Sequence, residues 1–139
     1  MSSAHVAEKV RARLAAAGTG LTIVSDTWLF NDEPAPDDVD YWLAADFPGG
    51  IEEQITVGAP GNNVFRESGA FQVHVFAKAG KGDTQLRTYA EAVREAFRAS
   101  TFDGIRCYGA DPAQIGDGDL RGRWLRATVA VEYEYDIYA

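Results

Sequence analysis

Hydrophobic and polar positions alternate along two stretches in the second half of the chain. Between residues 71 and 78 every odd position is apolar, while Gln72, His74 and Lys78 are polar and Phe76 is the exception among the even positions. A longer alternation runs from residue 124 to residue 138. A period of two is typical of a strand with one buried face, and a one-residue slip in the final run would bury its charges. The pattern therefore predicts two long strands, over residues 64–78 and 124–138.

A helical pattern separates these two runs. Within residues 83–100 the apolar positions recur at spacings of four, three and four residues and form one stripe: Leu86, Ala90, Val93 and Phe97. Such a stripe is typical of a helix that packs one face on a sheet. Residues 3–17 carry a thinner stripe of the same kind: Val6, Val10 and Leu14. We therefore expect two helices.

Shorter patterns predict the remaining elements. We expect a weak strand over 21–30, a hairpin of 41–47 and 51–57 around Pro48-Gly49-Gly50, a bulge near Ser68-Gly69 and a short strand over 105–108. Loops are expected at 31–38, 58–63 and 111–118. The simplest arrangement for this order of helices and strands is a mostly antiparallel sheet with the helices covering one face. The prediction is an α+β fold: a single domain over residues 1–139, with two helices packed on one face of the sheet.

Composition limits the class of protein. The chain has 139 residues, 46% of them apolar, and one cysteine. That is enough for one core, and a lone cysteine excludes an internal disulfide framework. No apolar run is long enough to cross a bilayer, and the first residues lack a signal-peptide pattern. We expect neither a membrane partner nor secretion.

The net charge of −8 is unevenly distributed along the chain. Residues 14–65 hold nine acids and no lysine or arginine, whereas residues 66–139 hold ten basic residues and eleven acids. Without a basic patch, specific nucleic-acid binding is not expected. The acidic segment has two interpretations. It is either a solvated face with loops, or a docking surface for the more basic half of a neighbouring copy.

The candidate catalytic groups do not form a known arrangement. His5 and His74 lie in a first helical turn and in mid-strand, and an ordinary surface or interface role fits them better than general-base catalysis. Cys107 has no cysteine or histidine beside it in the sequence, so a small strand residue is expected. We therefore expect no catalytic residues and no enzyme.

Two loops were candidates for binding sites. Gly80-Lys81-Gly82 fails the phosphate-loop pattern, because Val75 stands at the first glycine position and Gly82 follows the lysine. A calcium loop that begins at Asp117 would place Arg121 at its fifth position. We expect no cofactor-binding residues, no metal ligands and no cofactor.

The sequence also resembles a known family. The segments that carry the resemblance are residues 66–76, the Gly80-Lys-Gly82-Asp turn, the helix with Tyr89-Ala90 and Phe97, and residues 124–135. They are similar to the tail terminator proteins of long-tailed phages, a group that includes the minor tail protein U of lambda-like phages and related phage domains of unknown function. The similarity of layout covers residues 3–138.

The resemblance implies a structural role in the virion. Family members form a ring, usually a hexamer, that docks on the end of the tail tube, stops tube polymerisation and presents a surface to head-completion proteins. The implied partners are the protein itself, the tail tube protein and a neck protein, assembled in the host cytoplasm. In such a ring we expect acidic residues of one copy to face arginines of the next, with these residues at the subunit interface: Asp32, Asp37, Asp38, Asp40, Arg87, Arg94 and Arg98.

Two alternatives remain open at this level. The first is another neck component, such as a head–tail joining protein. The second belongs to a different class and is a small-molecule-binding domain or an enzyme of unknown substrate. A deep pocket lined by carboxylates with perturbed pKa values would favour the second.

Overall fold

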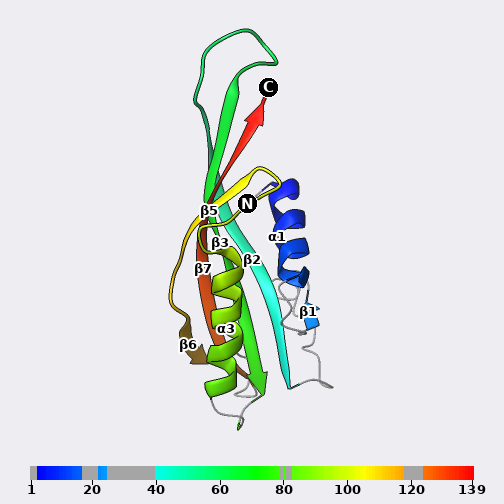
Figure 1. Ribbon diagram of the computed structural model, residues 1–139, viewed down its shortest axis with the longest axis vertical. Helices are drawn as coiled ribbons and strands as arrows, with labels where there is room; N and C mark the ends of the chain where they lie inside the picture. Colours follow the sequence, from blue (N-terminus) through cyan, green and yellow to red (C-terminus); the bar gives the residue numbers. More distant parts are fainter. Residues whose placement is uncertain (1–2, 17–21, 25–39, 79, 81–82, 118–123) are drawn as a thin grey trace.

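The computed structural model describes residues 3–16, 22–24, 40–78, 80, 83–117 and 124–139. In these ranges the chain forms two helices and seven strands (Figure 1). In chain order they are α1 (Ala4–Ala16), β1 (Thr22–Val24), β2 (Tyr41–Gln54), β3 (Val64–Lys78), α3 (Thr84–Phe97), β4 (Thr101–Phe102), β5 (Ile105–Ala110), β6 (Gln114–Asp117) and β7 (Trp124–Tyr138).

The described strands form one mixed sheet with the order β1-β2-β3-β7-β5-β4, and β6 also pairs with β7. β1 runs parallel to β2, and the other pairs are antiparallel. The longest pairing joins β3 to β7 without interruption, from Val64 opposite Tyr138 to Lys78 opposite Trp124. The expected α+β class is confirmed, and so are the two long strands that the alternation predicted.

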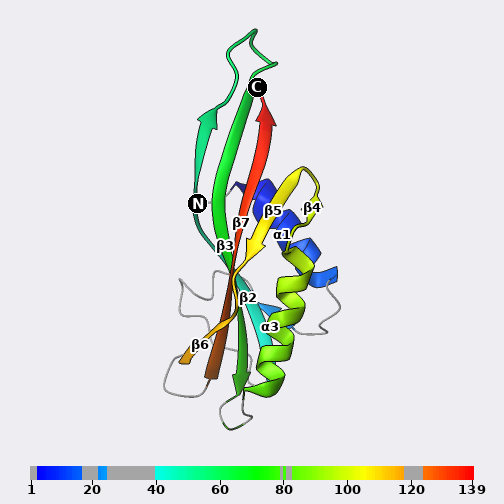
Figure 2. The same cartoon turned by 60° about the vertical axis from the view of Figure 1, so that its left-hand side comes forward.

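One face of the sheet carries the main core. The predicted stripes of both helices are buried in it, together with the alternate apolar positions of β3 and β7. Phe71 lies near its centre, with its ring centroid 5.1 Å from that of Phe97 and 6.1 Å from that of Tyr133. Figure 2 shows α1 and α3 beside the long strands. The two helical patterns therefore predicted real elements.

A second buried cluster lies on the opposite face of the sheet. The rings of Trp42 on β2 and Phe76 on β3 stack with centroids 4.0 Å apart, and both side chains are fully buried. His74 and Ala44 are buried beside them. Phe76, which broke the alternation in the sequence, is therefore half of an aromatic pair that belongs to the second face.

The predicted hairpin around Pro48-Gly49-Gly50 is wrong. β2 continues through these residues as one strand, and only its register on β3 shifts between Asp46 and Gly49. The irregularity predicted near Ser68-Gly69 therefore lies in the partner strand, since β3 itself is continuous. A bulge can absorb a proline and extra residues without reversing the chain, which explains the error.

The expected loops and the expected weak strand have different outcomes. Residues 114–117, expected as part of a loop, form the short strand β6 against β7. Of the weak strand expected over 21–30, the structure describes only β1, and the expected loop at 31–38 lies outside the described residues. The loop expected at 58–63 is present.

Candidate interaction surfaces

The far end of the sheet projects beyond the helices as a three-stranded extension, which we call the arm (residues 49–70 and 132–139) (Figures 1 and 2). It consists of the end of β2, the start of β3, the loop between them and the end of β7. The continuous β2–β3 hairpin that replaces the predicted one builds this arm.

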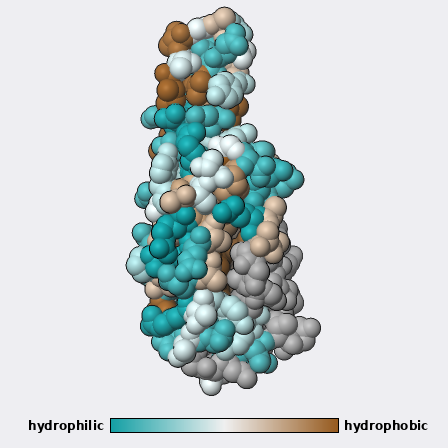
Figure 3. Space-filling model, viewed as in Figure 1, coloured by the Kyte–Doolittle hydropathy of each residue, from teal (hydrophilic) through white to brown (hydrophobic). Residues whose placement is uncertain are grey.

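Exposed large hydrophobic side chains gather on the arm. Among the described residues, Val57 is 95% exposed, Tyr138 72% and Ile51 69%, and Ile55 is also exposed. Tyr108, the fifth exposed side chain of this kind, lies at the arm's base on β5. Figure 3 shows hydrophobic side chains at the upper end of the molecule, over the arm. A cluster of exposed apolar side chains marks an interaction site more often than isolated ones do.

A buried polar contact fixes the base of the arm. The Tyr133 hydroxyl donates to Oε2 of Glu67 at 2.7 Å, and the backbone N–H of Ser3 points to the same oxygen at 3.3 Å. The Tyr133 hydroxyl lies over two glycines: a Cβ on Gly69 would stand 3.1 Å from it and only 2.5 Å from the Gly49 carbonyl oxygen. β3 therefore has no room for a side chain at Gly69, where it passes under Tyr133 and against β2.

The tip of the arm is closed onto the C-terminal residue. Asn63 and Ala139 exchange two backbone hydrogen bonds, at 3.0 and 2.9 Å. Within the tip loop, the Asn63 side-chain amide donates to the Gly58 carbonyl at 3.3 Å, and Thr56 Oγ1 accepts from Val64 N–H at 2.8 Å. These contacts join the loop to the strands that carry it.

An ion-pair network stiffens the face of the arm that points away from Tyr133. Asp136 accepts hydrogen bonds from Arg66 at 2.8 Å and from Arg106 at 3.2 Å. Glu134 accepts from Tyr108 at 2.9 Å and from Arg106 at 3.2 Å. The hydrogen bond from Arg66 is the main cause that lowers the pKa of Asp136 to about 2, and the one from Tyr108 lowers the pKa of Glu134.

A hollow of about 470 Å³ lies beside this network, at the base of the arm. Its floor is glycine and alanine backbone, and Ile51, Tyr108 and the acids Glu132 and Glu134 line it. The Glu134 carboxylate is ionised and already accepts a hydrogen bond from the guanidinium group of Arg106, so it is a poor proton acceptor. The hollow offers a shaped surface for contact rather than a set of catalytic groups.

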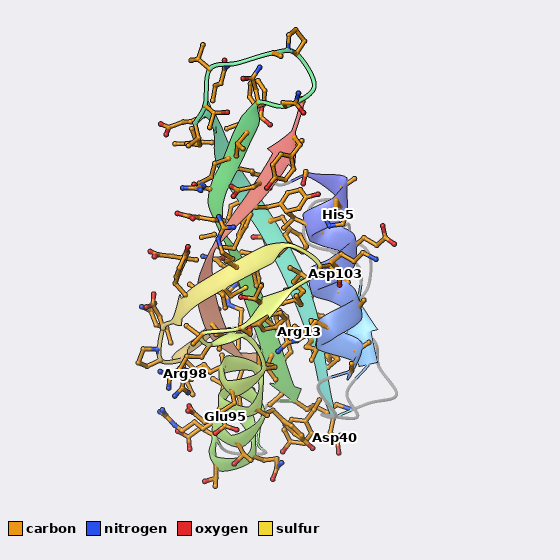
Figure 4. The ribbon with its side chains drawn as sticks, turned by 45° about the horizontal axis from the view of Figure 1, so that its top comes forward. His5, Arg13, Asp40, Glu95, Arg98 and Asp103 are labelled. Carbon is orange, nitrogen blue, oxygen red and sulfur yellow. The ribbon has the colours of Figure 1, made fainter. Side chains whose placement is uncertain are left out.

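The predicted interface residues are only partly described. Asp32, Asp37 and Asp38 lie outside the described residues, and Asp40 is exposed. The arginines lie on or just after α3 and have local partners: Arg87 contacts Asp83 at 2.9 Å, while Arg94 and Arg98 contact Glu91 at 3.0 and 3.3 Å. Figure 4 shows Asp40 and Arg98 well apart. A contact between Asp40 and Arg98 would therefore have to join separate copies.

The histidines have structural surroundings. His5 is hydrogen bonded to the Asp103 carbonyl at 3.2 Å, as Figure 4 illustrates, and stacks on Tyr135. His74, expected at the surface or in an interface, is buried, with Nδ1 2.8 Å from Thr128 Oγ1. Burial is the main cause that lowers its pKa to about 4. His74 is therefore neutral at pH 7.

Cys107 is buried on β5, and burial raises the pKa of its thiol to about 11. Its place in the main core agrees with the expected role as a small strand residue. The described residues contain no group of three or more His, Cys, Asp or Glu side chains placed to hold a metal ion. Searched over the same part of the chain, no helix is long and apolar enough to cross a membrane.

The exposed residues of the arm were not predicted from the sequence. Ile55 and Val57 were placed in the second strand of a hairpin that does not exist, where one apolar face would have been buried. The available signal was the polar loop 58–63 that follows them directly, because loops lie at the surface.

An elongated sheet with exposed apolar side chains gathered on its arm is typical of a protein that forms interactions. Comparison with known proteins gives the family. The family model described as "Phage tail terminator protein" matches residues 5–133. The chain belongs to this phage tail terminator family, and the resemblance found in the sequence is confirmed.

Comparison with solved structures supports the fold. Twenty-two chains match, and one of them, which carries no functional name, is 20% identical with a TM-score of 0.57. That match covers 95% of this chain and 92% of the other. At this identity the likeness shows the fold alone. No curated protein matches the chain.

Proposed function

We propose that this protein forms a ring that caps the phage tail tube, ends tube polymerisation and joins the tail to the head or neck. The family match over residues 5–133 is the observation that carries the proposal, since it supports a structural role in the phage tail. The ring is a homo-oligomer, with six copies as the expected number. Its other partners are the tail tube protein and a neck protein.

The protein acts as a building block rather than as an enzyme. It is one domain over residues 1–139, with both helices on one face of the sheet, and it is assembled into the virion in the host cytoplasm. The lowered pKa values of Asp136 and Glu134 are consistent with this role, because they arise mainly from the hydrogen bonds that Arg66 and Tyr108 donate to these carboxylates on the arm. No catalytic step is assigned to these groups.

The subunit interface is proposed to be partly electrostatic. The acidic residues Asp32, Asp37, Asp38 and Asp40 of one copy face the arginines Arg87, Arg94 and Arg98 of the next. The uneven charge along the sequence supports this, because a closed ring joins two different surfaces of each subunit. The Arg87 and Arg98 side chains are 58% and 47% exposed and can add a second carboxylate, whereas Arg94 is 20% exposed and also donates to the Ala110 carbonyl.

Charge reversal tests this interface. Arg94→Glu together with Arg98→Glu should reduce the assembly mass measured by light scattering, and high salt should do the same to the wild type. Glu95→Lys, also on α3, is the matched control, because it changes an exposed charge without adding an acid. If neither salt nor the double variant changed the assembly mass, the electrostatic interface would be refuted.

Electron microscopy tests the capping function itself. Purified protein mixed with tail tubes should appear in negative stain as a ring at one end of each tube. Rings on head particles but not on tubes would favour the head–tail joining protein instead. Binding to neither would refute both structural assignments.

A further inference from the structure

The arm joins the body along a line at which the sheet loses both its large side chains and its regular register. We infer that this line is a hinge about which the arm bends, and that the start of α1 is a strap that holds the arm in the direction seen. Bending changes the direction in which the exposed apolar side chains of the arm are presented. It is a property of one subunit, so it does not require the proposed ring.

Four residues that face one another across four strands mark this line. Gly50 of β2 pairs with Gly69 of β3. Tyr133 of β7 pairs with Gly69 on one side and with Cys107 of β5 on the other. We call these four residues the hinge row. A glycine inside a strand packs no side chain and weakens the strand locally, and hinges form at a few positions that absorb changes in the backbone angles. Two glycines in register therefore favour a bend at the base of the arm.

A register irregularity lies beside the hinge row on each of its two outer strands. The register of β2 on β3 shifts between Asp46 and Gly49, and the register of β5 on β7 shifts between Cys107 and Ala110. Both shifts are on the body side of the row. A bulge leaves residues unpaired, bends its strand and disrupts the ladder locally. The backbone pairing is therefore interrupted at the same level on both sides of the sheet.

The hollow gives the arm room to bend on one face of the sheet. Its volume is about 470 Å³, and its lining includes Glu132 and Glu134, which alternate with Tyr133 along β7 and therefore point to the opposite face. The Tyr133 face is filled, because a Cβ on Gly50 or Gly69 would stand 3.2 or 3.1 Å from the Tyr133 hydroxyl oxygen. The arm can therefore bend toward the hollow but not toward the Tyr133 ring.

The helix α1 joins the two sides of the hinge row. Towards its C-terminal end Leu14 is buried in the main core of the body, and the helix runs from there to the base of the arm (Figure 1). At its start, the Ser3 N–H points to Glu67 Oε2 at 3.3 Å, and His5 stacks on Tyr135 with ring centroids 4.7 Å apart. Glu67 and Tyr135 both lie on the arm side of the row. A bend toward the hollow would pull the arm away from α1, so these contacts oppose it.

Distances between two spin labels, measured by double electron–electron resonance, test the hinge. The labels are attached to Val57→Cys in the arm and to Gln85→Cys on α3, both exposed positions, and the buried native thiol of Cys107 should not react. With the strap intact, one narrow distance is expected. The strap variant, Ser3→Pro with His5→Ala, removes the N–H and the ring that hold the arm. It should add a second, shifted distance between the two labels.

Matched controls separate bending from unfolding. Glu8→Ala changes an exposed side chain of the same helix and should leave the single distance unchanged. A second label pair, Ile51→Cys with Val57→Cys, lies wholly on the arm side of the hinge row, so its distance should stay the same in the strap variant. Circular dichroism checks that the strap variant is folded. If it is not, His5→Ala alone, which keeps Ser3 in place, should still add the shifted distance, at a lower population.

Three results would overturn the hinge. The first is a folded strap variant, or a folded His5→Ala variant, that keeps the single distance between the arm and α3. The second is a distance that changes equally within the arm, because the arm would then fray rather than bend as a unit. The third is the same broad distribution with and without the strap contacts. None of these distances bears on tail length, so the proposed function is tested separately.

Discussion

His74 should make the protein less stable as the pH falls from 7.5 to 5. Its imidazole is 5% exposed, lies 2.8 Å from Thr128 Oγ1 and has its pKa lowered to about 4, first by burial and then by the charge of Arg126. In the unfolded chain the pKa returns to about 6.5. The unfolded chain therefore binds a proton where the folded chain does not, and stability is lost as the pH falls through this window.

The two pKa values set the size of the effect. Between pH 7.5 and pH 5 the free energy of unfolding should fall by about 2 kcal/mol, and the full difference, reached below pH 4, is about 3 kcal/mol. The paired carboxylates Asp136 and Glu134 also lose stabilisation in acid, but only as the pH approaches the unfolded carboxylate values of about 4. The interval from 7.5 to 5 therefore isolates the histidine.

Urea unfolding followed by circular dichroism at a series of pH values measures the effect. His74→Gln keeps a hydrogen-bonding group toward Thr128 but cannot be protonated, so its stability should change little over this interval. His5→Gln removes the other histidine and should keep the loss seen in the wild type. If wild type and His74→Gln lost the same stability between pH 7.5 and 5, the argument from burial would be refuted.

Three further predictions concern the arm and the core. Gly69→Ala should destabilise the protein by about 1–3 kcal/mol in urea unfolding, because the new Cβ would meet a backbone carbonyl of β2 at 2.5 Å, whereas Gly109→Ala, with no atom within 4 Å, should be nearly neutral. Equal effects of the two would contradict this. Tyr133→Phe should cost about 1–3 kcal/mol by leaving Glu67 without its buried donor, and an unchanged unfolding midpoint would refute the contact. Cys107 should react with a thiol reagent at pH 7 only after unfolding, and rapid labelling of the native protein would show that it is accessible.

The sequence predicted those parts of the fold in which one periodic pattern faces one core. β7 alternates over its whole length and pairs with β3 in the predicted region, and the stripe of α3 is buried as the spacing required. These patterns are unambiguous because one face is apolar and the other charged. The position of β6 could not be predicted in this way, since four residues at a sheet edge carry too short a pattern.

The arm and the second cluster could not be predicted because they depend on contacts distant in sequence. Gly50 is part of a local turn signal, yet it lies where β2 passes close to Tyr133, far along the chain: a Cβ on Gly50 would stand 3.2 Å from the Tyr133 hydroxyl. His74 has the alternation of a surface residue, but the stacked Trp42 and Phe76 make its face of the sheet a second buried layer. A single sequence does not show which polar position lies beside such a pair.

The distribution of tail lengths tests the central claim most directly. In a phage that lacks this protein, electron micrographs should show tails of uncontrolled length without attached heads, and supplying the protein in trans should restore a single length. Tails of normal, uniform length in its absence would contradict the assignment as the protein that ends tube polymerisation.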